Sequence, residues 1–202
     1  NGIGAEAGKA LALHPDVQKI SFTGSTAVGK LLMGYAGQSN MKRVALETGG
    51  KSPQIFMPDL YDLDAAIDRA IGGIYDNAGQ VCNAGSRPLV HRSLHDRFVE
   101  RFIARTDALY RMGDPLDPAT TMGPLVSQTQ KQNVLRRVSL AQKQGARIAL
   151  GDAANPLPSE NGAYVAPTLF VGARQEMSIV QEETFGPVAS VQLFDSEAEA
   201  IG

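Results

Sequence analysis

The spacing of hydrophobic residues predicts helices that alternate with strands. Apolar residues recur at intervals of three and four, the repeat of an amphipathic helix, in 4–14 and 27–36. A third helix follows, whose apolar face is formed by Leu63, Ile67, Ala70, Ile71 and Ile74. Three more helices begin with a capping-box pattern, at Ser93/Asp96, Ser127/Gln130 and Ser196/Glu199. Gly145 is placed to end the helix that begins at Ser127.

Short apolar runs between these helices predict strands. They cover 17–23, 42–47, 52–57, 88–91, 147–150, 164–171 and 187–194. We expect the first of them to be buried. Strands that alternate with helices indicate βαβ units and a parallel sheet, so the pattern predicts an α/β fold.

Composition narrows the class of protein. Of the 202 residues, 43% are hydrophobic, which is enough for a core, and the formal net charge of −2 gives no broad basic field. Nucleic acid and anionic membrane surfaces are therefore not expected partners, and no apolar run approaches the roughly 20 residues that span a bilayer. The chain lacks an initial Met and ends inside a predicted helix, so we expect it to be part of a longer protein.

The stretch GQVCNAGSR, residues 79–87, holds the single cysteine of the chain, Cys82. A lone cysteine cannot form an internal disulfide, which fits a reducing compartment and a cytoplasmic location. The neighbouring glycines let the backbone approach a ligand closely, so the surroundings of Cys82 favour chemistry over packing. None of His14, His91 and His95 stands in a cysteine-protease motif, and we interpret them as surface residues. No His/Cys/Asp spacing indicates a metal site.

Three other stretches could serve a site, and each has a structural alternative. Glu47 ends a predicted strand before two glycines, where it is either a general base or a solvated carboxylate. The turn SFTGSTAVGK could hold a phosphate, although a βα turn with a serine N-cap explains it better. By itself, QEETFGPV is typical of a solvated turn whose Phe185 packs into the core.

Taken in order, the stretches FTGSTAVGK, LETGGKSP, GQVCNAGSR and EETFGPV resemble the middle and later parts of NAD(P)-dependent aldehyde dehydrogenases, and MGPLVSQTQ is similar to a further family segment. The resemblance implies an aldehyde-dehydrogenase-like α/β fold. Residues 1–50 would be the C-terminal part of a Rossmann-like NAD(P)-binding domain, and 51–202 would form a catalytic domain with a largely parallel sheet.

The resemblance also implies roles for individual residues. Cys82 matches the nucleophile and Glu47 the general base. Residues that match cofactor-binding positions are Thr23, Gly24, Ser25, Thr48, Gly49, Glu183 and Phe185. The implied reaction oxidises an aldehyde to a carboxylic acid with NAD or NADP, through a thiohemiacetal and a thioester on Cys82. A glutamate at position 47 favours hydrolysis of the thioester over acyl transfer to coenzyme A.

Two residues depart from the family pattern. Thr48 replaces the usual leucine, and Pro88 lies early in a predicted strand, where it removes a ladder N–H. The family implies a homodimer or homotetramer. The aldehyde and the choice between NAD and NADP are left open by the sequence. A non-catalytic module of the same fold and a cysteine hydrolase of unrelated fold are the competing hypotheses.

Overall fold

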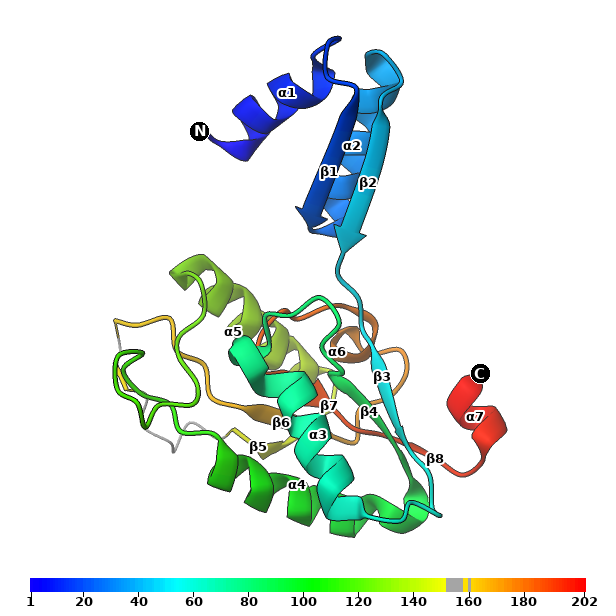
Figure 1. The fold of residues 1–202 in the computed structure, drawn as a ribbon. Coiled ribbons are helices and arrows are strands. Elements are labelled where there is room, and N and C mark those ends of the chain that lie inside the picture. Colours follow the sequence, from blue (N-terminus) through cyan, green and yellow to red (C-terminus); the bar gives the residue numbers. More distant parts are fainter. Residues whose placement is uncertain (152–157, 160) are drawn as a thin grey trace. The chain divides into compact units, whose positions relative to one another are not determined.

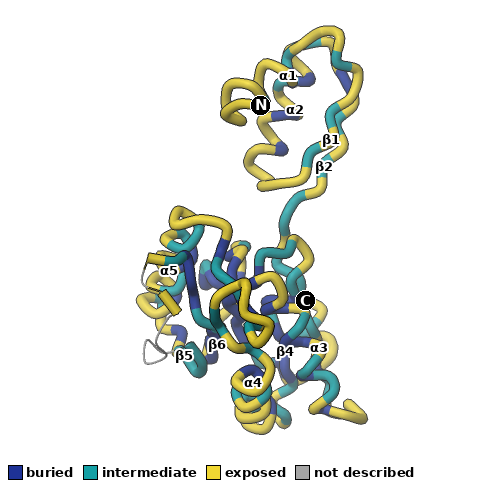
Figure 2. Tube along the Cα trace, turned by 60° about the vertical axis from the view of Figure 1, so that its left-hand side comes forward, coloured by how far each residue is buried: buried dark blue, intermediate teal, exposed yellow. Residues whose placement is uncertain are grey.

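The computed structural model describes residues 1–151, 158–159 and 161–202. Its contacts divide the chain into two compact units, Asn1–Gly49 and Gly50–Gly202, whose helices and strands are labelled in Figure 1. Buried positions are concentrated in the second unit, whereas most of the first is exposed (Figure 2). Both units combine helices with parallel strands, so the α/β fold class is confirmed.

The first unit contains one βαβ element. A π-helical turn (Gly4–Gly8) and α1 (Lys9–Leu13) precede it, and its parts are β1 (Lys19–Gly24), α2 (Thr26–Gln38) and β2 (Arg43–Thr48). The strands pair in parallel. Gly29 lets α2 lie close to β2, because an added Cβ would be 3.1 Å from Cδ1 of Leu46. In β1, Ile20 and Phe22 are half-buried but the alternate residues are exposed, so the prediction of a buried strand was wrong for one face.

In its described residues, the second unit contains two three-stranded sheets. Their strands, in spatial order, are β3 (Pro53–Phe56), β4 (Arg87–His91) and β8 (Gln192–Phe194), and then β5 (Arg147–Leu150), β6 (Thr168–Val171) and β7 (Val188–Ser190). Among the strands of the described residues, only β5 is antiparallel to its neighbour. One chain segment joins the sheets, because β7 and β8 are separated by Val191 alone, whose N–H donates to Phe170 O. Ser190 N–H donates in the other direction, to Ser86 O.

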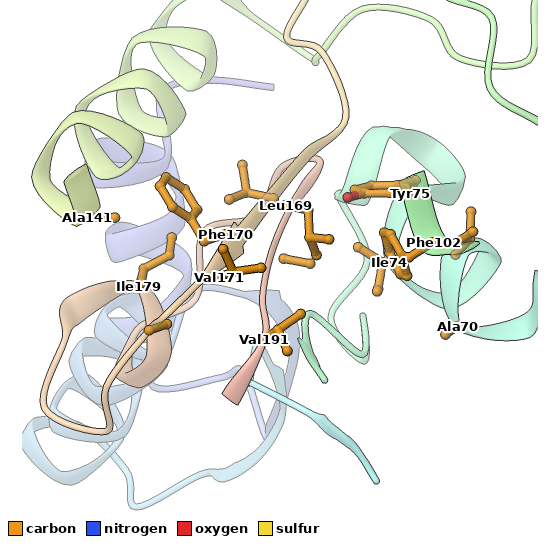
Figure 3. Close-up of a cluster of buried hydrophobic side chains, with 14 of the residues drawn as sticks. Ala70, Ile74, Tyr75, Phe102, Ala141, Leu169, Phe170, Val171, Ile179 and Val191 are labelled. Atoms are coloured by element: carbon orange, nitrogen blue, oxygen red, sulfur yellow. The ribbon is translucent and has the colours of Figure 1, made fainter. Parts of the chain in front are cut away.

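Helices cover both faces of β6. They are α3 (Leu63–Tyr75), α4 (His95–Leu109), α5 (Gln128–Lys143) and α6 (Ser178–Gln181), and α7 (Glu197–Ile201) follows β8. In Figure 3, Leu169 points toward Tyr75 of α3, while Phe170 points toward Ala141 of α5 and Ile179 of α6. This alternation follows from the two-residue period of a strand that is buried on both faces. Tyr75 also donates a hydrogen bond of 3.0 Å to Thr168 O, which satisfies its buried hydroxyl.

Most of the predicted helix boundaries are confirmed. The Ser127 hydroxyl accepts a hydrogen bond from Gln130 N–H at 3.2 Å, and Gly145 follows the helix with φ +100°. The Ser196 hydroxyl likewise accepts from Glu199 N–H. The prediction for Ser93 was wrong: α4 begins at His95, and Ser93 lies in a 3₁₀ turn (Arg92–Leu94) where its N–H donates to Nδ1 of His91.

Two of the predicted strands are shorter than expected. Of 164–171, only the part after Pro167 is a strand, and 187–194 is interrupted at Val191. Pro88 is the second residue of β4, and the pairing of β4 with β8 begins only at Leu89. Its missing N–H therefore falls where that ladder has not yet begun.

Candidate active site

The carboxyl ends of β1 and β2 bring together the site residues predicted in the first unit. Their register pairs Thr23 with Glu47 and Gly24 with Thr48. The Ser25 hydroxyl accepts a hydrogen bond of 3.3 Å from Val28 N–H, which confirms that this serine is the N-cap of α2. Glu47 is exposed at the strand end, which leaves its carboxylate open to a ligand or to water.

The backbone before Cys82 takes an uncommon conformation. Asn77, Ala78 and Gly79 have φ of 52°, 53° and 70°, so three consecutive residues are left-handed where α3 ends. This conformation costs a non-glycine residue about 1–2 kcal/mol. A Cβ atom at Gly79 would lie only 2.2 Å from Gly186 O, so no larger residue fits. The turn leads into Cys82, which is a free and exposed cysteine.

The same contact joins the cysteine loop to the loop that contains Glu183 and Phe185. Two hydrogen bonds from Nε2 of Gln130, to Phe185 O at 2.8 Å and Thr184 O at 3.3 Å, fasten that second loop to α5. Phe185 has φ 52° and its side chain is 39% exposed. The expectation that it packs into the core was therefore wrong.

Glu183 carries a buried oxygen, Oε1, that has no hydrogen-bond partner among the described residues. Burial raises the pKa of this carboxyl, and the Gly50 backbone N–H, Lys51 and Arg137 partly offset the rise. A buried acceptor without a partner carries a desolvation penalty, so it is suited to a ligand hydroxyl that would donate to it. Gly50 also borders the cysteine loop, since a Cβ there would be 3.9 Å from Cys82 O.

Lys51 is a charged residue of the site that the sequence interpretation missed. Its Nζ is buried and has no hydrogen-bond partner within the described part of the chain. Burial lowers the pKa of Lys51 to about 8; the charges of Arg137 and Arg87 add to this, and that of Glu183 opposes it. The signal was present in LETGGKSP, where the lysine directly follows the two glycines.

A cavity of about 580 Å³ opens beside Glu183 and Phe185. Gln130, Asn133 and Arg137 of α5 line its other wall. Arg137 forms a 2.7 Å ion pair with Glu182, and the cavity is also lined by Arg136, by the amide side chains of Gln130 and Asn133, and by Glu183 and the exposed Phe185. These groups fit a ligand that has hydroxyl groups next to a flat ring, as the ribose and nicotinamide of NAD(P) do.

Two classes of site are not found in the described residues. Across 1–151, 158–159 and 161–202, no group of three or more His, Cys, Asp or Glu side chains is arranged to hold a metal ion. None of the helices in the same ranges has the length and apolar character needed to cross a membrane.

Comparison with known proteins identifies the family of this chain. The loop that contains Cys82 and the loop that contains Glu183, called here the glutamate loop, both lie within the matched residues. The sequence model of the aldehyde dehydrogenase family matches residues 1–202. This chain belongs to the aldehyde dehydrogenase family. It is 42% identical to the mitochondrial aldehyde dehydrogenase of Mesocricetus auratus over 201 residues, which is all of this chain and 39% of that protein.

Solved aldehyde dehydrogenase structures have the same fold. The AldA indole-3-acetaldehyde dehydrogenase of P. syringae, solved with NAD+ and IAA, is 50% identical with a TM-score of 0.94, and the match covers 99% of this chain and 40% of that one. KauB from Pseudomonas aeruginosa is 47% identical with a TM-score of 0.94 over the same shares. The resemblance inferred from the four motifs is thus confirmed, and this chain spans about two fifths of the length of these relatives.

Proposed function

We propose that this chain is the central and catalytic part of an enzyme that oxidises an aldehyde to a carboxylic acid with NAD(P)+. The packing of Gly79 against Gly186 carries the proposal, because it holds the Cys82 thiol and the Glu183 carboxylate on two adjoining loops of one unit. Membership of the family supports the reaction class, and solved relatives that contain NAD+ support the cofactor.

In this mechanism Cys82 is the nucleophile. Its thiolate adds to the aldehyde carbonyl carbon, and the carbonyl oxygen becomes the oxyanion of a thiohemiacetal. The Cys82 backbone N–H stabilises that oxyanion in part. Exposure of the thiol and the small residues around it leave room for the aldehyde to approach.

The cofactor would be held by the residues that match the family's cofactor-binding positions. Glu183 would accept hydrogen bonds from the nicotinamide ribose, Phe185 would flank the ring, and the turn Thr23–Ser25 with Thr48 and Gly49 would approach the rest of the dinucleotide. The bound nicotinamide supplies a hydride acceptor. Loss of hydride from the thiohemiacetal carbon leaves a thioester on Cys82.

Glu47 completes the cycle as a general base. It takes a proton from a water molecule, the resulting hydroxide adds to the thioester carbon, and the carboxylic acid and the Cys82 thiolate are released. An acid product, rather than an acyl-coenzyme A, is therefore expected. A cytoplasmic location and a homodimer or homotetramer remain predictions, and the name of the hamster relative places that protein in mitochondria.

The test measures cofactor reduction by absorbance with the whole protein, a panel of aldehydes, and NAD or NADP. We expect reduced cofactor with at least one aldehyde, and we expect Cys82→Ala to abolish it while circular dichroism stays unchanged. Alkylation of Cys82 by iodoacetamide should be fast and slowed by cofactor, whereas an inert thiol would favour a non-catalytic module. A folded protein that reduces neither cofactor across the panel would refute the proposed activity.

A further inference from the structure

A second cavity, of about 350 Å³, lies on the cysteine loop. Val81 and Asn83, the residues on either side of Cys82, both line it. The end of α3 forms another part of its wall, through Gly72, Gly73 and Asp76. An aldehyde that reaches Cys82 can therefore place the rest of its chain in this cavity.

Asp76 gives the cavity its charge. Its Oδ1 accepts a hydrogen bond from the Tyr110 hydroxyl, and its Oδ2 lies over Gly72, 3.6 Å from where a Cβ of that residue would stand. Within the described part of the chain, no lysine or arginine forms an ion pair with Asp76, and none lines the cavity. The carboxylate thus has one oxygen held by tyrosine and one available to a ligand.

Two further features strengthen the negative potential. Asp76 caps the C-terminal end of α3, where the helix dipole places partial negative charge on the last carbonyl groups. Burial, the hydrogen bond and the charge of Asp76 all raise the pKa of Tyr110, so this hydroxyl stays protonated and remains a donor. The tyrosine therefore orients the carboxylate without neutralising it.

The other residues that line this cavity are uncharged, and some of them are small enough to leave space for a ligand. Gly72 and Gly73 contribute no side chain, and the nearest atom to a Cβ at Gly73 is Nε2 of Gln54 at 3.7 Å. Gln54 is itself held by donating to Ala70 O and Gly85 O. A compact cationic group fits this combination of space, a single carboxylate and fixed amides.

We infer that the preferred substrate is an aldehyde whose far end carries a positive charge, such as an ammonium or guanidinium group, and that Asp76 is the residue that selects it. This inference rests on the proposed function, because it assigns the tail of the substrate and leaves the reaction at Cys82 as described. An aldehyde with a carboxylate tail would be repelled by Asp76.

The test compares two aldehydes of the same shape in the whole protein. One is 4-(trimethylammonio)butanal, which does not cyclise, and the other is its uncharged carbon analogue 5,5-dimethylhexanal. The readout is the ratio of kcat/KM for the charged aldehyde to that for the neutral one. We expect a ratio above one that falls by about threefold to fivefold in Asp76→Asn, which is the upper part of the range for losing one exposed charge pair.

Asp64→Asn is the matched control, since it removes the same charge near the other end of α3, where Asp64 pairs with Arg101. It should leave the ratio unchanged. A further measurement needs no variant: higher ionic strength should lower the ratio in the unaltered protein, because salt screens the attraction.

A ratio that does not change in Asp76→Asn, or that is below one and insensitive to salt, would overturn the role of Asp76 and leave the proposed function standing. The same holds if other aldehydes are oxidised and neither of these two is. If no aldehyde of any kind reduces the cofactor, the proposed function fails and the substrate class fails with it.

Discussion

Replacement of Lys51 by methionine is expected to stabilise the protein at neutral pH. Methionine keeps the length of the side chain and removes the buried ammonium, which has no hydrogen-bond partner among the described residues. The pKa of Lys51 falls from 10.5 to about 8, and each pH unit corresponds to about 1.4 kcal/mol, so the buried charge costs about 3 kcal/mol. Losing the attraction to Glu183 is already contained in that shift.

The sign of the pH dependence follows from which state binds more protons. Below pH 8 the lysine is protonated in both the folded and unfolded states, so the full cost is present. Between pH 8 and 10.5 the unfolded state binds more protons, and the folded protein with Lys51 gains stability relative to the methionine variant. We therefore expect Lys51→Met to raise the free energy of unfolding by about 2–3 kcal/mol at pH 7 and by much less at pH 10.

Chemical unfolding followed by far-UV circular dichroism at the two pH values measures this difference. Lys42→Met is the matched control. Lys42 is also buried, but its Nζ donates to Ala12 O at 2.6 Å and to the Ser39 hydroxyl at 2.7 Å, so its loss should destabilise the protein at both pH values. If Lys51→Met is less stable at pH 7, or if its advantage is the same at pH 10, the lysine is not desolvated as described.

Three other changes test the fold and the site. Gly79→Ala should destabilise the protein by several kcal/mol and slow alkylation of Cys82, because its Cβ would meet Gly186 O; unfolding curves and iodoacetamide kinetics measure both effects. Gly34→Ala, in the open middle of α2, is its control and should stabilise by about 0.5–1 kcal/mol. Phe102→Ala should cost about 3–5 kcal/mol in denaturant, since this ring is fully buried. The 202 residues alone should show little or no turnover, because one face of the β1–β2 pair is exposed and the chain spans about two fifths of the length of its solved relatives.

Each of these expectations has a contradicting result. A Gly79→Ala protein of ordinary stability and thiol reactivity would mean that the two loops can move apart. A loss below about 1 kcal/mol in Phe102→Ala would mean that the core around it collapses without strain. Turnover by the isolated residues at the rate of a complete relative would show that the described part already grips the cofactor.

Periodicity and caps predicted the elements where local chemistry decides them. Ser127 and Gly145 mark the two ends of α5 correctly because the cap hydrogen bond and the positive φ are properties of those residues themselves. Ser93 misled because a competing partner, Nδ1 of His91, took the hydrogen bond that a capping box would need. Phe185 misled because its left-handed backbone depends on contacts of its loop with α5, which are distant in sequence.

In the candidate site, too, the residues that local motifs mark were predicted, and those that depend on distant contacts were missed. Cys82 and Glu47 were predicted from motifs, and the structure places the one on an exposed loop and the other at a strand end. Lys51 and Asp76 were not predicted from the sequence. Lys51 matters because its Nζ is buried, and Asp76 because one of its oxygens is available to a ligand, and both features arise only in the folded chain. No hydrophobic period marks such residues.

The backbone contact between Gly79 and Gly186 also sets what can be varied in this protein by design. The cysteine loop and the glutamate loop pack directly against each other. A library of variants that randomises only one of the two loops would therefore yield mostly inactive proteins. The end of α3 is a separate part, where a Cβ added at Gly72 or Gly73 would make only ordinary van der Waals contacts, with Asp76 and Gln54. Substitutions there could reshape the choice of aldehyde while the chemistry is inherited intact.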